Sequence, residues 1–144
     1  MVPGPGVLWR AVLPTVARAG EPFRLSLKAD DKWGNPSNLV DRTVRLEADR
    51  PVAQLPERLR FAAGAYAAIA EGLRVERPGD VAIRVLDESG TELCRANPLR
   101  IVAKGEPLVH FWGDTHAQSN ETVGTNTARE YFEFGRDKAF LDVI

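Results

Sequence analysis

Cysteine and histidine are scarce in this 144-residue chain, which has one cysteine and two histidines. The single Cys94 excludes an internal disulfide framework and is consistent with a reducing compartment. No stretch approaches the roughly 18 apolar residues that a transmembrane helix needs. The first six residues also lack the basic and apolar regions of a signal peptide. These absences predict a cytoplasmic protein that does not contact a membrane.

The chain also lacks a strong excess of positive or negative charge. The chain has 19 basic and 20 acidic residues, which gives a net charge of −1. A nearly neutral protein lacks the general electrostatic attraction that holds nucleic-acid binders on phosphates, so we expect no nucleic-acid partner. Its 44% hydrophobic and 27% charged residues are typical of a globular protein.

The composition changes near Lys104-Gly105-Glu106-Pro107. All ten prolines lie at or before Pro107, and glycine and proline often separate structural elements. We therefore predict one domain over residues 1–105 and a shorter second unit over residues 106–144.

Residues 1–105 have the pattern of short strands joined by turns. Apolar and polar residues alternate over 23–28 and 43–48, as in half-buried strands. The turns between strands are rich in Asp, Asn, Gly and Pro. Residues 64–70 are ambiguous, because their alanines allow a helix while Gly64 and the neighbouring strand rhythm favour a strand. About seven or eight such strands predict an immunoglobulin-like antiparallel β-sandwich.

Residues 106–144 have a different pattern. We expect a strand at 108–113, a polar loop at 114–126, a helix at 127–139 and the start of a second strand at 140–144. Thr127 is a good helix N-cap, and Glu130 completes a capping box. This order is that of an incomplete βαβ segment, whose parallel strands need further strands and helices to cover them.

Three polar side chains follow the predicted strand at 108–113. Asp114, His116 and Gln118 alternate, so on an extended backbone they project from the same face. A carboxylate, an imidazole and an amide at the end of a strand are what the first part of an active site would contain. Asp114 either orients the imidazole or forms an Asx turn, and the sequence leaves both roles open.

These residues carry a family resemblance. Phe111-Trp112-Gly113-Asp114-Thr115-His116-Ala117-Gln118-Ser119, with residues 121–143, resembles the start of the catalytic region of DUF3604 proteins. Those proteins are similar to the PHP (polymerase and histidinol phosphatase) metal-dependent phosphoesterases. The likeness is close over residues 109–144 and looser before them. It implies that the chain is the N-terminal portion of an uncharacterised metal-dependent hydrolase, and that residues 106–144 begin a PHP-like α/β barrel.

The resemblance also implies roles for the three side chains. The PHP pattern opens with Gly-Asp-x-His-x-His, and its two histidines bind catalytic metal ions. His116 matches the first histidine, whereas Gln118 stands where the second would be. The neutral carbonyl of Gln118 is a weaker ligand for zinc-like metals than imidazole. We therefore interpret His116 as a possible metal ligand, with Asp114 and Gln118 as weak ones.

The number of ligands limits what this chain can do alone. A catalytic zinc site needs about three protein ligands and an open position. We therefore expect a Zn or Mn ion only in a longer protein, and we predict that the 144-residue chain binds no metal tightly and catalyses no hydrolysis.

The remaining candidates have simpler interpretations. We expect His110 to be structural, Phe111 and Trp112 to be core residues, and Cys94 to be a small buried hydrophobe. Trp33 either anchors a ligand or packs on its own loop, which is the commoner role. Two further function classes stay open: a binding or accessory module built on the sandwich, and an assembly module that forms a homodimer through residues 108–144.

Overall fold

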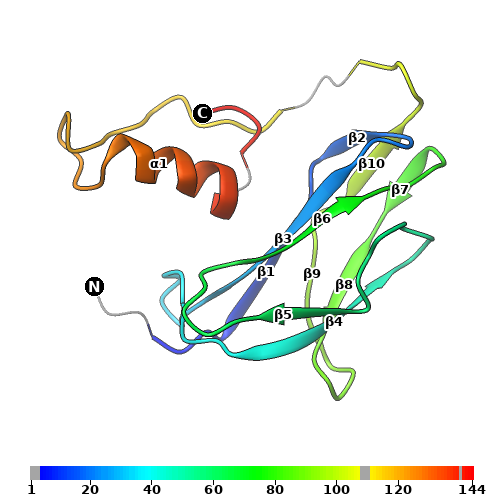
Figure 1. Cartoon of the computed structure of the whole chain (residues 1–144), viewed down its shortest axis with the longest axis horizontal. Coiled ribbons are helices and arrows are strands. Elements are labelled where there is room, and N and C mark those ends of the chain that lie inside the picture. Colours follow the sequence, from blue (N-terminus) through cyan, green and yellow to red (C-terminus); the bar gives the residue numbers. More distant parts are fainter. Residues whose placement is uncertain (1–3, 108–110, 140) are drawn as a thin grey trace.

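The computed structural model describes residues 4–107, 111–139 and 141–144 (Figure 1). These residues form ten strands followed by one α-helix and one turn of π-helix. The strands are β1 Leu8–Val12, β2 Val16–Arg18, β3 Phe23–Asp30, β4 Arg42–Ala48, β5 Arg58–Phe61, β6 Ala68–Leu73, β7 Gly79–Val81, β8 Ile83–Leu86, β9 Glu92–Arg95 and β10 Leu99–Val102. The helices are α1 Ala128–Phe134 and η1 Gly135–Ala139. The chain is therefore mainly β, as predicted.

The strands form three sheets, with the orders β1-β3-β6, β2-β10-β7 and β5-β4-β8-β9. Their pairs are antiparallel except one: β2 and β10 run parallel, with Ala17 opposite Ile101. The predicted antiparallel sheets are therefore present, and this one parallel pair is an addition that the sequence did not indicate. Parallel neighbours need a long connection, and here the intervening strands supply it.

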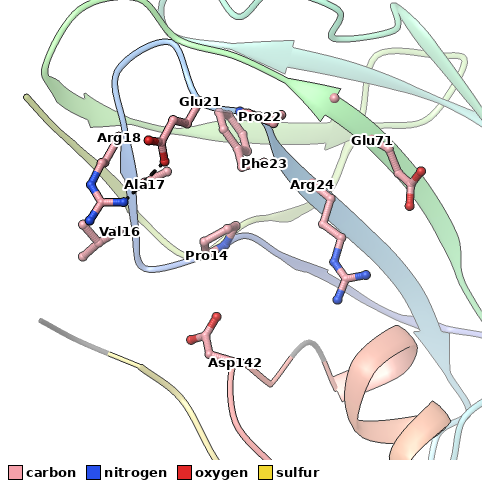
Figure 2. A pocket seen from close by; sticks show the side chains of 11 residues that line it. Pro14, Val16, Ala17, Arg18, Glu21, Pro22, Phe23, Arg24, Glu71 and Asp142 are labelled. Atoms are coloured by element: carbon pink, nitrogen blue, oxygen red, sulfur yellow. Dashed lines mark ion pairs between the residues drawn. The ribbon is translucent and has the colours of Figure 1, made fainter. Parts of the chain in front are cut away.

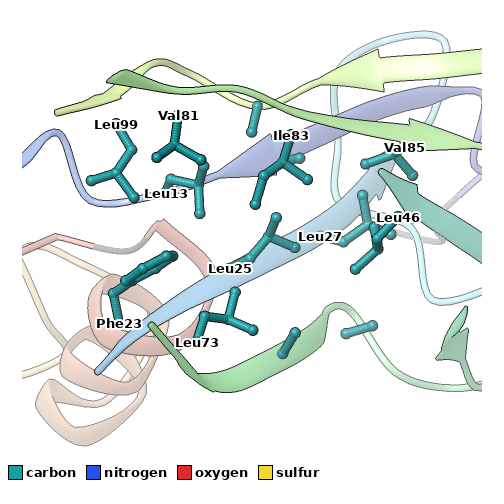
Figure 3. Packing of buried hydrophobic residues seen from close by; sticks show 14 of the residues in the cluster. Leu13, Phe23, Leu25, Leu27, Leu46, Leu73, Val81, Ile83, Val85 and Leu99 are labelled. Carbon is teal, nitrogen blue, oxygen red and sulfur yellow. The ribbon is translucent and has the colours of Figure 1, made fainter. Parts of the chain in front are cut away.

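One hydrophobic core joins the sheets. Leu25 and Leu27 of β3 are fully buried, and Figure 3 shows Leu25 facing Ile83 of β8 and Leu27 beside Leu46 of β4. The alternation in β4 is confirmed as well, because Val44 and Leu46 are buried. β3 departs from simple alternation. It lies between β1 and β6, and Ser26 is buried together with Leu25 and Leu27.

The ambiguous stretch 64–70 leads into a strand. Gly64 has φ of 82° in the preceding turn, and β6 begins at Ala68 and pairs with β3. The strand interpretation is confirmed for residues 68–70, which belong to β6, whereas residues 64–67 form the turn before it. β6 covers one side of the core, because Ala68, Ala70 and Leu73 are buried. Ala68 and Ala70 lie opposite Leu27 and Leu25 of β3 in the sheet, so these alanines belong to a strand and not to a helix.

The C-terminal segment (residues 111–139 and 141–144) lies to one side of the strands, with α1 beside the chain end (Figure 1). Thr127 caps α1 and Glu130 closes the capping box, as predicted. The helix is α-helical only to Phe134, and η1 follows where we expected α-helix to continue to residue 139.

The predicted strands of this segment do not form in the described residues. Residues 111–113 and 141–144 share a single parallel bridge, between Gly113 and Val143, and residues 108–110 and 140 lie outside the described part. The structure therefore does not support a βαβ unit. Two short segments without further strands bury too little surface to form a regular sheet.

Candidate functional site

The loop that holds the three candidate side chains starts at Gly113, where residues 112–114 pair with residues 142–143. The Asp114 N–H donates to the Val143 carbonyl at 3.2 Å. The close approach of these two backbones favours glycine at position 113, since a Cβ there would lie 3.0 Å from the Val143 carbonyl oxygen, which is a tight contact. The hydrogen bond between Asp114 and Val143 therefore fixes the position at which the candidate loop begins.

Asp114, His116 and Gln118 lie together on this loop. Asp114 Oδ1 accepts a hydrogen bond from the His116 backbone N–H at 2.9 Å. Gln118 Nε2 lies 3.4 Å from His116 Nε2. All three residues are exposed. The structure thus places the predicted residues side by side, as the alternation required.

The contact of Asp114 favours one of its two open roles. Its carboxylate caps the backbone two residues on, which is the geometry of an Asx turn. The ring neighbour of His116 in the structure is Gln118. Among the described residues, no three His, Cys, Asp or Glu side chains come together as a metal site would require.

The loop closes on itself after Gln118. The Gly124 N–H donates to the Ser119 carbonyl at 2.9 Å, and the Asn120 N–H donates to the Asn126 carbonyl at 2.7 Å. A Cβ at position 124 would lie 2.6 Å from the Gln118 carbonyl oxygen, so this position requires glycine. The turn therefore holds Gln118 close to the start of α1.

The first turn of α1 completes this arrangement. The Glu130 N–H donates to Thr127 Oγ1, and the Thr127 N–H donates to Glu130 Oε2 at 2.8 Å. Burial, followed by the Asp114 carboxylate, raises the pKa of the Tyr131 hydroxyl. Tyr131 therefore stays protonated beside the candidate residues at neutral pH.

A hollow of about 670 Å³ lies between the loop and the helix. Gln118 lines one side, and Glu130, Tyr131, Glu133, Phe134 and Asp137 line the helical side. Sequence reasoning missed this hollow. The acidic and aromatic residues of 130–137 were visible, but only the loop closure at Gly124 brings Gln118 to face them.

A second hollow lies where the C-terminal segment meets the strands. Figure 2 shows Asp142 facing Pro14 and Arg24 across this groove. Arg24 also donates from Nη2 to the Arg136 carbonyl at 2.6 Å. Trp112 Nε1 donates to Thr15 Oγ1 nearby. These polar contacts join the two parts of the chain.

Three aromatic side chains singled out from the sequence are exposed. Phe111 and Trp112 are 60% and 66% exposed, so the expectation that they are core residues was wrong. Trp33 is 78% exposed, and Lys32 Nζ lies 4.8 Å from the centre of its ring, so its contact lies within its own loop and both of its open roles remain. Without the predicted strand, Phe111 and Trp112 have no sheet face to pack on. Trp33 projects because Asp31 accepts hydrogen bonds from the Trp33 and Asn35 N–H groups, which turns the loop outward.

The remaining two predictions have different outcomes. Cys94 is half-buried against the core, and burial raises the pKa of its thiol to about 11. It is therefore a weakly reactive packing residue, close to what we expected. His110 lies outside the described residues, and its structural role stays a prediction.

Comparisons with known proteins add little to this site. No protein-family model matches the chain, and no curated protein matches it. Among solved structures, the chain is similar to the PKD domain of an M14-like peptidase from a Thermoplasmatales archaeon, with a TM-score of 0.33 and 11% identity. That match covers 71% of this chain and 98% of the other. A likeness at this level carries no argument about function.

Proposed function

We propose that this chain is the N-terminal portion of a DUF3604-type metal-dependent hydrolase. In this proposal, an immunoglobulin-like β-sandwich precedes the opening segment of a PHP-like catalytic domain. His116 is the first ligand of a Zn or Mn ion, and Gln118 and Asp114 are weaker oxygen ligands or hydrogen-bonding partners. The 144-residue chain alone is not catalytically competent, because a working site needs about three good ligands.

The observation that carries the proposal is the arrangement of the three side chains. They lie on one exposed loop, with Gln118 Nε2 within 3.4 Å of His116 Nε2. The Asx turn at Asp114 fixes the backbone of His116. An exposed imidazole on such a loop is accessible to a metal ion and to ligands from elsewhere in a longer protein. A divalent metal ion held by this imidazole would act as the Lewis acid of a hydrolase or activate its water molecule.

A Zn²⁺ titration followed by NMR tests the proposal. We expect weak, rapidly exchanging binding, with shifts at the amides of residues 113–119 and no zinc retained after dialysis. His116→Ala should abolish these shifts. His110→Ala is the matched control, since it removes the other histidine and should leave them unchanged. Tight stoichiometric binding, or shifts that survive His116→Ala, would contradict the proposed ligand role.

The exposed apolar side chains favour a second candidate function, assembly through the C-terminal segment. Phe111, Trp112, Phe132 and Val143 are all at least half exposed, and such surfaces commonly mark contacts between proteins. We propose a homodimer through this segment as the alternative. Sedimentation analysis should then show a dimer that Phe132→Ser weakens and Leu39→Ser, an equally exposed control on the strand side, does not. A monomer at all concentrations would exclude it.

The third class, a binding or accessory module, rests on Trp33. Its side chain is 78% exposed, and its backbone is held by the Asp31 carboxylate. An exposed aromatic on a fixed loop is suited to anchor a partner. A ligand screen whose hit is lost in Trp33→Ala, but kept in Leu39→Ala, would favour this function over the other two.

A further inference from the structure

The hollow between the closed loop and α1 has an acidic lining. Glu130, Glu133 and Asp137 contribute three carboxylates, and no lysine or arginine is among the described residues that line it. Two aromatic residues of α1, Tyr131 and Phe134, line the same space and lie between the acidic residues in the sequence. The hollow therefore combines negative charge with aromatic surface.

The carboxylates are held in place from outside the hollow. Glu133 Oε1 accepts from Arg129 Nε at 2.8 Å, and Asp137 Oδ2 accepts from Arg136 Nη2 at 2.6 Å. The hydrogen bonds from Thr127 lower the pKa of Glu130, so this carboxylate is ionised at neutral pH. Asp137 Oδ1 also lies 4.0 Å from Arg24 Nη1, so two of the three carboxylates have arginine partners that do not line the hollow. Such solvent-screened pairs are weak, so a bound cation can compete for these carboxylates.

This lining selects among ligand classes. A phosphate or carboxylate ligand would meet like charges, which costs free energy. An ammonium or guanidinium group would meet carboxylate acceptors, and aromatic faces also attract cations. A bare metal ion is not expected here, because the described residues include no cluster of three His, Cys, Asp or Glu groups that could hold one. The space of about 670 Å³ is that of a small molecule.

We propose that this hollow binds a small organic cation, an amine or guanidinium group on an apolar stem. The charged group lies near Glu133 and Glu130, and the stem lies along Tyr131 and Phe134. Gln118 adds an amide that can donate to or accept from a polar substituent. The proposal goes beyond the hydrolase assignment and does not require metal at His116, so either can fail alone.

A matched set of three probes tests the charge preference. Benzylamine, benzyl alcohol and benzoate share an aromatic ring and differ mainly in charge. We expect saturable NMR shifts at residues 118, 130, 131, 133 and 134 with benzylamine. Benzyl alcohol should bind several-fold more weakly, and benzoate should give no saturable shift at these residues. Equal binding of the alcohol or benzoate, or benzylamine shifts located elsewhere, would overturn the proposal.

A substitution tests the site itself. Glu133→Gln removes one charge with little change of shape, and we expect it to weaken benzylamine about two- to fivefold, as for an exposed ion pair. Glu88→Gln, on the strand side, is the control and should have no effect. Amide spectra of α1 show whether the helix persists in each variant. An unchanged affinity in a folded Glu133→Gln protein would refute the assigned role of this carboxylate.

Discussion

Trp112 and Asp142 hold each other by two hydrogen bonds, although 30 residues separate them. The Trp112 N–H donates to Asp142 Oδ2 at 2.8 Å, and the Asp142 N–H donates to the Trp112 carbonyl at 2.7 Å. Within the described part of the C-terminal segment, one β-bridge, between Gly113 and Val143, adds to these hydrogen bonds. The carboxylate of Asp142 is therefore an important part of the junction from which the candidate loop starts.

Removing this carboxylate should loosen the junction. We expect Asp142→Ala to speed exchange of the Trp112 amide hydrogen about fivefold, since one hydrogen bond contributes about 1 kcal/mol. Asp142→Asn keeps an oxygen acceptor and should preserve most of the protection. Asp41→Ala, which removes an exposed carboxylate paired with Arg60 on the strand side, is the control. Unchanged exchange in Asp142→Ala would show that other contacts hold the junction.

The core of the strand region should be sensitive at β3. Leu27 is fully buried in the centre of the core, whereas Leu39 is exposed. Leu27→Ala leaves a cavity and should lower the free energy of unfolding by about 2–5 kcal/mol. Leu39→Ala, the same chemical change at the surface, should alter it by less than about 0.5 kcal/mol. Denaturant unfolding measures both, and equal effects would argue against the position of β3 in the core.

The N-cap of α1 should control local helix stability. Thr127→Ala removes the oxygen that accepts from the Glu130 N–H, and we expect a cost of about 0.5–2 kcal/mol. Amide exchange of residues 130–134 is the readout, because the change is local. Thr127→Ser keeps the hydroxyl and should behave like the parent chain. A similar loss in both variants would point to the methyl group instead of the cap.

The same cap should make α1 sensitive to acid. Hydrogen bonds from the Thr127 N–H and hydroxyl lower the pKa of Glu130 below its ordinary value of 4.5. Because the ionised carboxylate is favoured in the folded helix, it stabilises the helix at pH values above the ordinary pKa of Glu130. This stabilisation is lost as the pH falls through the lowered pKa of the folded state. Helical NMR shifts should therefore weaken below about pH 4. Glu130→Gln should remove this dependence, and Glu121→Gln should keep it.

Cys94 should react slowly with thiol reagents. Burial raises the pKa of its thiol from 9.0 to about 11, so the thiolate fraction near pH 8 is about a hundredfold lower than for an ordinary cysteine. We expect alkylation of the folded chain to be slower than that of the denatured chain by about this factor. Reaction at equal rates would show that Cys94 is not covered by the neighbouring strands.

The strand region could be predicted well from local patterns. Alternation placed β3 and β4, because this signal depends only on neighbouring residues. The Pro-Gly-Asp sequence at 78–80 was a misleading turn signal, because Gly79 and Asp80 belong to β7 and pair with β10. The parallel pairing of β2 with β10 could not be predicted this way. It joins residues 16–18 to 100–102, and no local pattern encodes which distant edge a short strand will meet.

By itself, the sequence determined the capped start of α1, the alternating core strands, and the placing of Asp114, His116 and Gln118 on one polar loop. Each of these depends on side chains within a few residues of one another. Only the tertiary structure decided that Phe111 and Trp112 are exposed, that Gly113 forms a single bridge with Val143, and that Gln118 faces the acidic side of α1. Those features depend on which distant surfaces are available to pack, and that is a property of the whole fold.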